Sequence, residues 1–187
     1  VFSGKGKFGI FGDGKELPQL AMNHFFKNGD FRSGYYRDQT LLLAQGNLSV
    51  ANIFSALYAD LNLEREPMSG GRSMGGHFVT ACRDENGGWL NIMEMKNHSG
   101  DVSPTGSQMP RLLGLAQASK IYRTLKTKNS DKFSNNGNEI AWGTIGNAST
   151  SEGMFFETIN AAGVLQVPMV ISVWDDGYGI SVSNKDQ

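Results

Sequence analysis

The sequence predicts an α/β fold in which a parallel sheet is flanked by helices on both faces. Residues 139–145 and 169–173 read as short strands, and the stretch between them carries apolar side chains at helical spacing before Gly163. Strand, helix and strand within about 35 residues predict one βαβ unit with a right-handed crossover. The second strand is almost continuously apolar, which is typical of a parallel strand covered on both faces.

Composition is that of an ordinary globular protein. The chain has 187 residues, of which 39% are hydrophobic and 19% charged, and its net charge is −1. This length predicts one substantial core and a single domain over residues 1–187. The charge balance gives no sign of a polyanion-binding surface, so we expect no nucleic-acid partner.

The cysteine count and the hydropathy of the chain indicate the compartment in which we expect the protein. Cys82 is the lone cysteine and there are three histidines, so neither an internal disulfide nor a structural zinc site is expected. A lone thiol fits a reducing compartment, and we expect a cytoplasmic protein. No apolar run approaches the ~20 residues of a membrane span. The first residue is Val1 and the chain stops soon after a strand, so we expect a fragment of a longer protein.

The remaining elements follow from local pattern. Apolar spacing predicts helices over residues 17–27, 50–61 and 110–125. We interpret three further segments as non-helical, namely a loop or strand end at 33–38, a Gly/Met-rich loop at 67–77 and an exposed turn at 126–138. His24 is expected on a helix face and His98 in a loop. Ser149 and Glu152 fit a capping box, which predicts that the helix of the βαβ unit begins there.

Two loops follow the two strands of the βαβ unit. They are Gly146–Gly153 and Trp174–Ser181. Ligands of open α/β sheets bind beyond the carboxyl ends of the strands, so Asn147 and Asp176 could face a common point there. Amide, carboxylate and carbonyl oxygens suit Mg²⁺ or Ca²⁺, and the following helix presents N–H groups to a phosphate. The alternative is ordinary turn and capping chemistry, which uses the same residue types.

In order and spacing, these loops resemble those of thiamine-diphosphate-dependent 2-oxoacid dehydrogenases. The α portion of their E1 components carries Gly-Asp-Gly-Ala, Ser-Glu-Gly, Glu-Ala-X-Asn, a proline before a strand, and Asn-Asn-X-Tyr-X-Ile-Ser. The corresponding segments here are Gly146-Asn147-Ala148-Ser149, Ser151-Glu152-Gly153, Glu157-Thr158-Ile159-Asn160, Pro168 and Asp175-Asp176-Gly177-Tyr178-Gly179-Ile180-Ser181. The resemblance runs from about Gly9 to Ser181 and is strongest to a bacterial form in which the α and β portions are fused. It implies the thiamine-diphosphate-binding fold.

The resemblance also implies a metal and diphosphate site, with two departures from the family. The family's acid is Asn147 here and its second asparagine is Asp176, so the site keeps one carboxylate and one amide. We expect Asn147 Oδ1, Asp176 and the Tyr178 carbonyl to bind Mg²⁺. Further cofactor contacts are expected from Gly146, Ala148, Ser149 and Ile180. Trp174 stands where some members carry a diphosphate-binding arginine.

Three other segments match family positions. Tyr36 and Arg37 resemble the pair that contacts the diphosphate, and Arg37 can bind phosphate oxygens bidentately. The alternative for Arg37 is pairing with Asp38 or another carboxylate. His77 ends a Gly-rich segment, like the active-site histidine of the family, and histidine suits proton transfer near neutral pH. The alternative is a loop histidine bonded to backbone.

The segment Val102–Pro110 resembles the family's Ser-Pro-Leu-Ala-Thr-Gln-Ile-Pro. By this resemblance Ser103 and Thr105 line the thiazolium, and Ser107 and Gln108 match positions that hold a structural K⁺ in some members. The alternative is that Ser107 caps the following helix, with Pro110 in its first turn.

The resemblance implies an E1 component that decarboxylates a 2-oxoacid oxidatively and passes the acyl group to a lipoyl group. The implied partners are the β portion of E1, fused or separate, and a lipoyl-bearing E2, in a homodimer or α2β2-type assembly. A catalytic glutamate comes from the β portion in this family, so we expect the isolated chain to be inactive. Two alternatives stay open: a non-catalytic module that binds metal–phosphate weakly or mediates assembly, and a transketolase-like or acetoin-cleaving enzyme.

Overall fold

The computed structural model describes residues 3–6, 9–73 and 75–187. Packing of Cα atoms divides the chain into two compact units, one made of residues 1–26 and 35–79 and the other of residues 27–34 and 80–187. The single domain over residues 1–187 stays a prediction.

The first unit contains helices α1 (Glu16–Phe25), α2 (Gln39–Ala44) and α3 (Val50–Leu57). Helix α1 packs against α2. The fully buried Gln19 joins them, because its Oε1 accepts from Leu41 N at 2.9 Å and its Nε2 donates to Arg37 O at 3.2 Å. A buried amide costs little when both ends are bonded, so Gln19 fixes how the segment at Arg37 lies on α1.

Helix α3 is shorter than predicted. Ser49 and Asn52 form a capping box at its start: Asn52 N donates to Ser49 Oγ at 3.1 Å, and Ser49 N donates to Asn52 Oδ1 at 2.9 Å. The helix ends at Leu57, since Ala59 has φ of 56° and leaves the helical conformation. The apolar spacing continues to Leu61, which explains why the pattern alone predicted a longer helix.

The second unit is built on a sheet with strand order β2-β1-β3-β4. Its strands are β1 (Phe31–Tyr35), whose last residue belongs to the first unit, β2 (Asn97–Val102), β3 (Ala141–Gly146) and β4 (Met169–Trp174). Strand β3 pairs in parallel with both β1 and β4. The predicted α/β class, with a parallel sheet flanked by helices, is confirmed.

Helices α4 (Gln108–Tyr122) and α6 (Gly153–Leu165) pack on each other and over the sheet. The core beneath α4 consists of Met109, Leu112, Ala116, Ala141 and Ile145, all 0–2% exposed. Gly143 lies on the same face of β3 as Ala141 and Ile145, and a Cβ there would come within 2.3 Å of Leu112 Cδ2. The missing side chain therefore lets α4 approach the strand closely.

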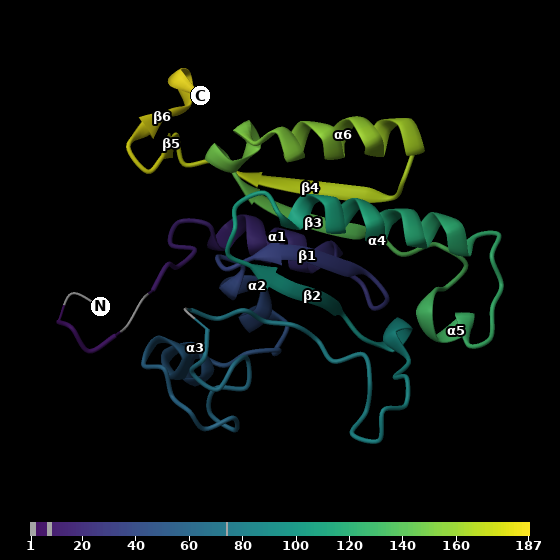
Figure 1. The fold of residues 1–187 in the computed structure, drawn as a ribbon, viewed down its shortest axis with the longest axis horizontal. Helices are drawn as coiled ribbons and strands as arrows, with labels where there is room; N and C mark the ends of the chain where they lie inside the picture. Colours follow the sequence, from purple (N-terminus) through teal and green to yellow (C-terminus); the bar gives the residue numbers. More distant parts are fainter. Residues whose placement is uncertain (1–2, 7–8, 74) are drawn as a thin grey trace. The chain divides into compact units, whose positions relative to one another are not determined.

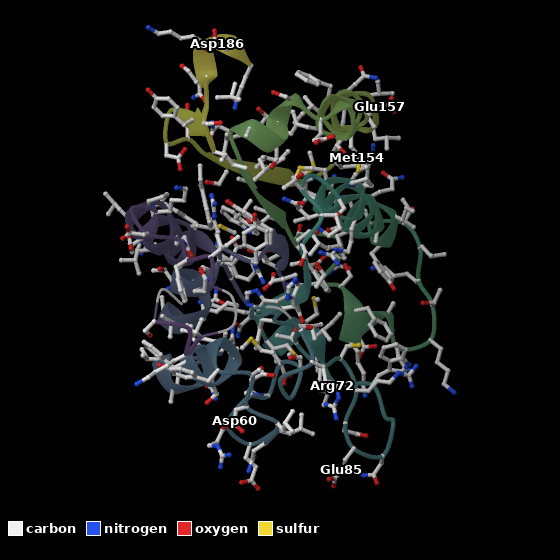
Figure 2. The ribbon with its side chains drawn as sticks, turned by 60° about the vertical axis from the view of Figure 1, so that its left-hand side comes forward. Asp60, Arg72, Glu85, Met154, Glu157 and Asp186 are labelled. Atoms are coloured by element: carbon white, nitrogen blue, oxygen red, sulfur yellow. The ribbon has the colours of Figure 1, made fainter. Side chains whose placement is uncertain are left out.

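The chain leaves the carboxyl end of β4 into a small hairpin (Figure 1). Its strands are β5 (Tyr178–Gly179) and β6 (Val182–Ser183), which pair antiparallel, and the 3₁₀ turn Asn184–Asp186 follows. Figure 2 labels Asp186 in this turn, and Met154 and Glu157 on α6. The other short elements are α5 (Ser130–Phe133) and the 3₁₀ turns Ile92–Glu94 and Ala148–Ser151.

The predicted capping box at Ser149 is wrong. Residues Ala148–Ser151 form a 3₁₀ turn, and α6 begins at Gly153 without a side-chain cap from Glu152. The hydroxyl of Thr150 donates to Asn147 O at 2.6 Å. Such a bond to a carbonyl three residues back stabilises a tight turn in place of a helical start.

Two other predictions need correction. His98 is a strand residue in β2 and is 2% exposed, not a loop residue. Residues 126–138 are not simply an exposed turn: they contain α5, and the Ser134 hydroxyl donates to Glu139 Oε2 at 2.9 Å in a buried bond. No helix in the described part of the chain combines the length and apolar character needed to cross a membrane.

Candidate functional site

Strands β3 and β4 end side by side. Their parallel register pairs Gly146 with Trp174, and Asn147 N donates to Trp174 O at 3.3 Å just beyond that pair. The two loops that follow therefore start from neighbouring points at one edge of the sheet, where open α/β sheets bind their ligands.

The Asn147 side chain joins the two loops. It is 8% exposed, and its Nδ2 donates to the Tyr178 carbonyl at 3.1 Å and to Asn184 Oδ1 at 2.5 Å. Two of the three expected metal ligands, Asn147 and the Tyr178 carbonyl, are thus in direct contact. The nitrogen of the amide, rather than its oxygen, faces that carbonyl.

Asp175 and Asn184 take part in this arrangement, although sequence reasoning did not select them. Asn184 Nδ2 donates to Asp175 Oδ1 at 2.5 Å, and Gly177 N donates to the same oxygen at 2.8 Å. The hairpin β5–β6 folds the chain back so that Asn184 reaches Asn147. A polar residue after a short hairpin carries no sequence signal for this contact.

Asp176 lies at the exposed side of the loop. Its Oδ1 accepts from Tyr178 N at 3.4 Å. Among the described residues no three His, Cys, Asp or Glu side chains form a group that could hold a metal ion. A cation here would therefore depend on amide and carbonyl oxygens as well as carboxylates, all of which Mg²⁺ accepts.

The other candidate residues of the two loops range from half-buried to fully exposed. Ala148 is exposed, and a Cβ at Gly179 would come within 2.5 Å of its Cβ, so hairpin and turn meet closely. Gly146 and Ser149 are half-buried. Ile180 is fully exposed and has φ of 58°. A branched residue costs energy in that left-handed conformation, and such strain clusters at functional sites.

Trp174 occupies the last position of β4. It is 3% exposed, and its Nε1 donates to Ser172 Oγ at 2.9 Å. The indole therefore packs within the protein, where the family's arginine would carry a charge.

The segment from Val102 to Ser107 links β2 to α4. Ser103 and Thr105 are exposed. Ser107 does not cap α4 with its side chain, since its hydroxyl donates to Pro104 O at 2.8 Å. Gln108 is 1% exposed, its Nε2 donates to Thr144 O at 2.9 Å, and its Oε1 is buried without a hydrogen-bond partner among the described residues.

In the first unit, Tyr36 and Arg37 are both half-buried. The Arg37 guanidinium lies 5.8 Å from the centroid of the Tyr36 ring. Its Nε is buried and has no hydrogen-bond partner among the described residues. A buried donor of this kind is costly unless it is satisfied, so it is a place where an anion can bind.

His77 follows a loop that the buried Glu66 organises. The Glu66 carboxylate accepts from Met68 N, Ser69 N and Gly71 N at 2.8–2.9 Å, and from the Ser69 hydroxyl at 2.8 Å. Burial opposes the charge, but these hydrogen bonds hold the pKa of Glu66 below its usual value. In the same loop Arg72 Nη1 donates to Ser69 O at 3.1 Å (Figure 2). His77 is half-buried and places Nδ1 3.4 Å from Gly75 O.

Sequence reasoning also missed a buried polar cluster formed by Arg32, His98 and Asp101. Arg32 is fully buried, donates from Nε to His98 Nδ1 at 2.8 Å, and pairs from Nη2 with Asp101 Oδ1 at 2.5 Å. Burial, and then the charge of Arg32, lower the pKa of His98 to about 2. The imidazole is therefore neutral and accepts at Nδ1.

Comparisons with known proteins show the family to which the chain is similar. Residues 2–187 match a family model described as the dehydrogenase E1 component. The chain is 28% identical to a 2-oxoisovalerate dehydrogenase subunit alpha of Bacillus subtilis (strain 168), over 96% of this chain and 46% of that protein. It is 26% identical to a pyruvate dehydrogenase E1 component subunit alpha of Acholeplasma laidlawii, over 90% of this chain and 37% of that protein.

The chain thus spans less than half the length of either relative. Because the family model covers nearly every residue, the chain belongs to the dehydrogenase E1 component family.

Proposed function

We propose that this chain supplies the metal- and diphosphate-binding part of the cofactor site in an E1 component. That component would decarboxylate a 2-oxoacid oxidatively with thiamine diphosphate and pass the acyl group to a lipoyl group. The proposal is carried by the contact of Asn147 with the Tyr178 carbonyl at the ends of two parallel strands. Both residues match the family's metal-binding motif in order and spacing.

The oxygen donors at this strand end fit Mg²⁺ in kind. Asn147, Asp176 and the Tyr178 carbonyl would hold the ion, with the diphosphate completing its coordination. Asn147 presents Nδ2 to the carbonyl, so its amide has to turn over, and release Asn184, for Oδ1 to bind the metal. Its neighbours Gly146, Ala148, Ser149 and Ile180 would contact the cofactor.

The Nε of Arg37, buried and without a hydrogen-bond partner in the described part of the chain, fits the role of a diphosphate ligand, with Tyr36 beside it. Ser103 and Thr105 would line the thiazolium. Ser107 and Gln108 would hold K⁺. Gln108 Oε1, which no described residue hydrogen-bonds, supplies an oxygen of the kind that a K⁺ ion binds.

Thiamine diphosphate supplies the carbanion chemistry when bound, and the protein orients the reactants and handles protons. His77 would position the substrate and transfer a proton at an imidazole nitrogen. A β portion, fused or separate, and a lipoyl-bearing E2 would complete the machinery, in a homodimer or an α2β2-type assembly in the cytoplasm.

Calorimetric titration tests the cofactor site. Thiamine diphosphate titrated into the 187-residue chain should release heat only when Mg²⁺ is present. No Mg²⁺-dependent heat would contradict the proposal and favour a non-catalytic assembly module.

Exchanging the acid and the amide tests the ligand assignment. Asp176→Asn leaves no carboxylate among the assigned ligands, so Mg²⁺-dependent affinity should fall about tenfold or more. The double variant Asn147→Asp/Asp176→Asn should recover it. Asp175→Asn is the matched control, because it removes a neighbouring carboxylate that is bonded to Asn184, and it should keep the affinity. If Asp176→Asn binds like the parent, the ligand assignment is wrong.

Activity separates the remaining alternatives. The isolated chain should not turn over pyruvate or a branched-chain 2-oxoacid, and turnover would contradict its dependence on a β portion. Once a β portion is added, transfer to a sugar instead of a lipoyl group would favour a transketolase-like enzyme.

A further inference from the structure

We propose that Arg32 and Ser33, neighbouring residues of β1, are positioning residues that pin the two ends of the segment 102–107. This inference rests on the proposed function, in which Ser103 and Thr105 of that segment line the thiazolium. The segment is exposed at Ser103–Thr105, whereas the residues that flank it, Asp101 and Gln108, accept hydrogen bonds from β1.

The upstream end is held by Arg32. Its guanidinium pairs with Asp101, which immediately precedes the segment, and the two side chains are 0% and 3% exposed. The same guanidinium donates from Nε to His98 in β2. The planar fork of arginine makes both bonds at once, which the single ammonium of lysine cannot reproduce in that geometry.

The downstream end is held by Ser33. Its hydroxyl donates to the carbonyl of Gln108, the first residue of α4, at 2.9 Å, and accepts from Arg111 Nε at 3.0 Å. Ser33 is fully buried. The Gln108 side chain adds a bond to Thr144, two residues before Gly146, so the start of α4 is tied to β1 through Ser33 and to β3 through Thr144.

Consecutive strand residues point to opposite faces of a sheet. Arg32 and Ser33 therefore hold the segment from opposite faces, and their spacing is fixed by one peptide unit. Holding both ends of the segment in this way limits how far Ser103 and Thr105 can move, which is how supporting residues pre-organise a binding loop.

Hydrogen exchange of the amides in residues 102–107 tests the pinning without any cofactor. Ser33→Ala removes the hydroxyl and should raise exchange in this segment about three- to tenfold. The matched control is Ser119→Ala. It removes a hydroxyl near the far end of α4 that donates a buried hydrogen bond to Glu139 O at 2.8 Å. Faster exchange in the control, or unchanged exchange in Ser33→Ala, would overturn the pinning.

Calorimetry then tests the consequence for the cofactor. Ser33→Ala and Arg32→Lys should weaken thiamine diphosphate about three- to tenfold and leave Mg²⁺–pyrophosphate unchanged, because only the thiazolium is expected beside the segment. Equal weakening of both ligands would indicate general damage and overturn the positioning role, as would unchanged affinity for both. If the parent binds neither ligand, the proposed function fails, while hydrogen exchange still decides the pinning.

Discussion

Two of the polar clusters in the second unit differ in how their groups are satisfied. In the buried cluster of Arg32, His98 and Asp101, the charges are paired within the protein and almost no surface is exposed. The strand-end cluster consists of Asn147, Asp175, the Tyr178 carbonyl and Asn184. None of these four members is positively charged, and Asp175 is exposed, as is the adjacent Asp176. The first uses paired charges to join β1 to β2, whereas the second has the exposed carboxylate of Asp176 beside it, which a ligand can reach.

Removing one charge of the buried cluster should have the largest effect. Arg32→Met removes the ion-pair partner of the buried Asp101 side chain, and the free energy of unfolding should fall by about 3–5 kcal/mol. Chemical denaturation measures it. The double variant Arg32→Met/Asp101→Leu should recover most of this loss, because it removes the carboxylate together with its ion-pair partner. If the double variant is less stable than Arg32→Met, the charge of Asp101 is not the cause of the stability loss.

Glu66, in the first unit, extends the comparison to a single buried carboxylate bonded to a loop. Glu66→Gln should lower the free energy of unfolding by about 2 kcal/mol at pH 7, because an amide accepts these N–H groups less strongly than a carboxylate. The lowered pKa of Glu66 means that this stability is full above its ordinary value of 4.5 and is lost as the pH falls below it. Parent and variant should therefore converge in acid. A constant difference down to pH 3 would contradict this.

His98 gives the buried cluster its own pH dependence. The pKa of His98 in the folded protein is about 2, below the ordinary value of 6.5. Below pH 6.5 the imidazole is therefore protonated in the unfolded chain but stays neutral in the folded one. Stability is therefore full above pH 6.5 and falls as the pH drops, by about 1.4 kcal/mol at pH 5.5. His98→Gln should remove this part of the slope, as measured by urea denaturation at pH 7.5 and pH 5.5. Parallel pH profiles of parent and variant would contradict it.

Asp176, beside the strand-end cluster, should contribute least to the free energy of unfolding. Asp176→Asn changes an exposed carboxylate, so the free energy of unfolding should stay within about 0.5 kcal/mol of the parent. The same variant is expected to lose Mg²⁺-dependent affinity, which separates binding from folding at this position. A large loss of stability would mean that Asp176 holds the loop.

The same contrast explains what the sequence could predict. Strands β3 and β4 and helix α6 were located to within a few residues, because their apolar patterns are local. Strand β2 was not predicted, because its sequence Asn97–Val102 is polar. The strand is stabilised by a hydrogen bond from Arg32 to His98, and these two residues are 66 positions apart in the sequence. The approach of Asn184 to Asn147, 37 residues apart, likewise depends on a hairpin that local pattern does not specify.

Gly143 of β3 shows how core packing beneath α4 limits the substitutions that the fold accepts. A methyl group at this position would come within 2.3 Å of Leu112 Cδ2, so the Leu112 side chain would have to give up its place in the core beneath α4. A residue with no side chain thereby provides the space that a leucine of the opposing helix fills. Substitution at position 143 is limited by the volume of the added group, which has to be accommodated beneath the helix whose first residue is bonded to Ser33 and Thr144.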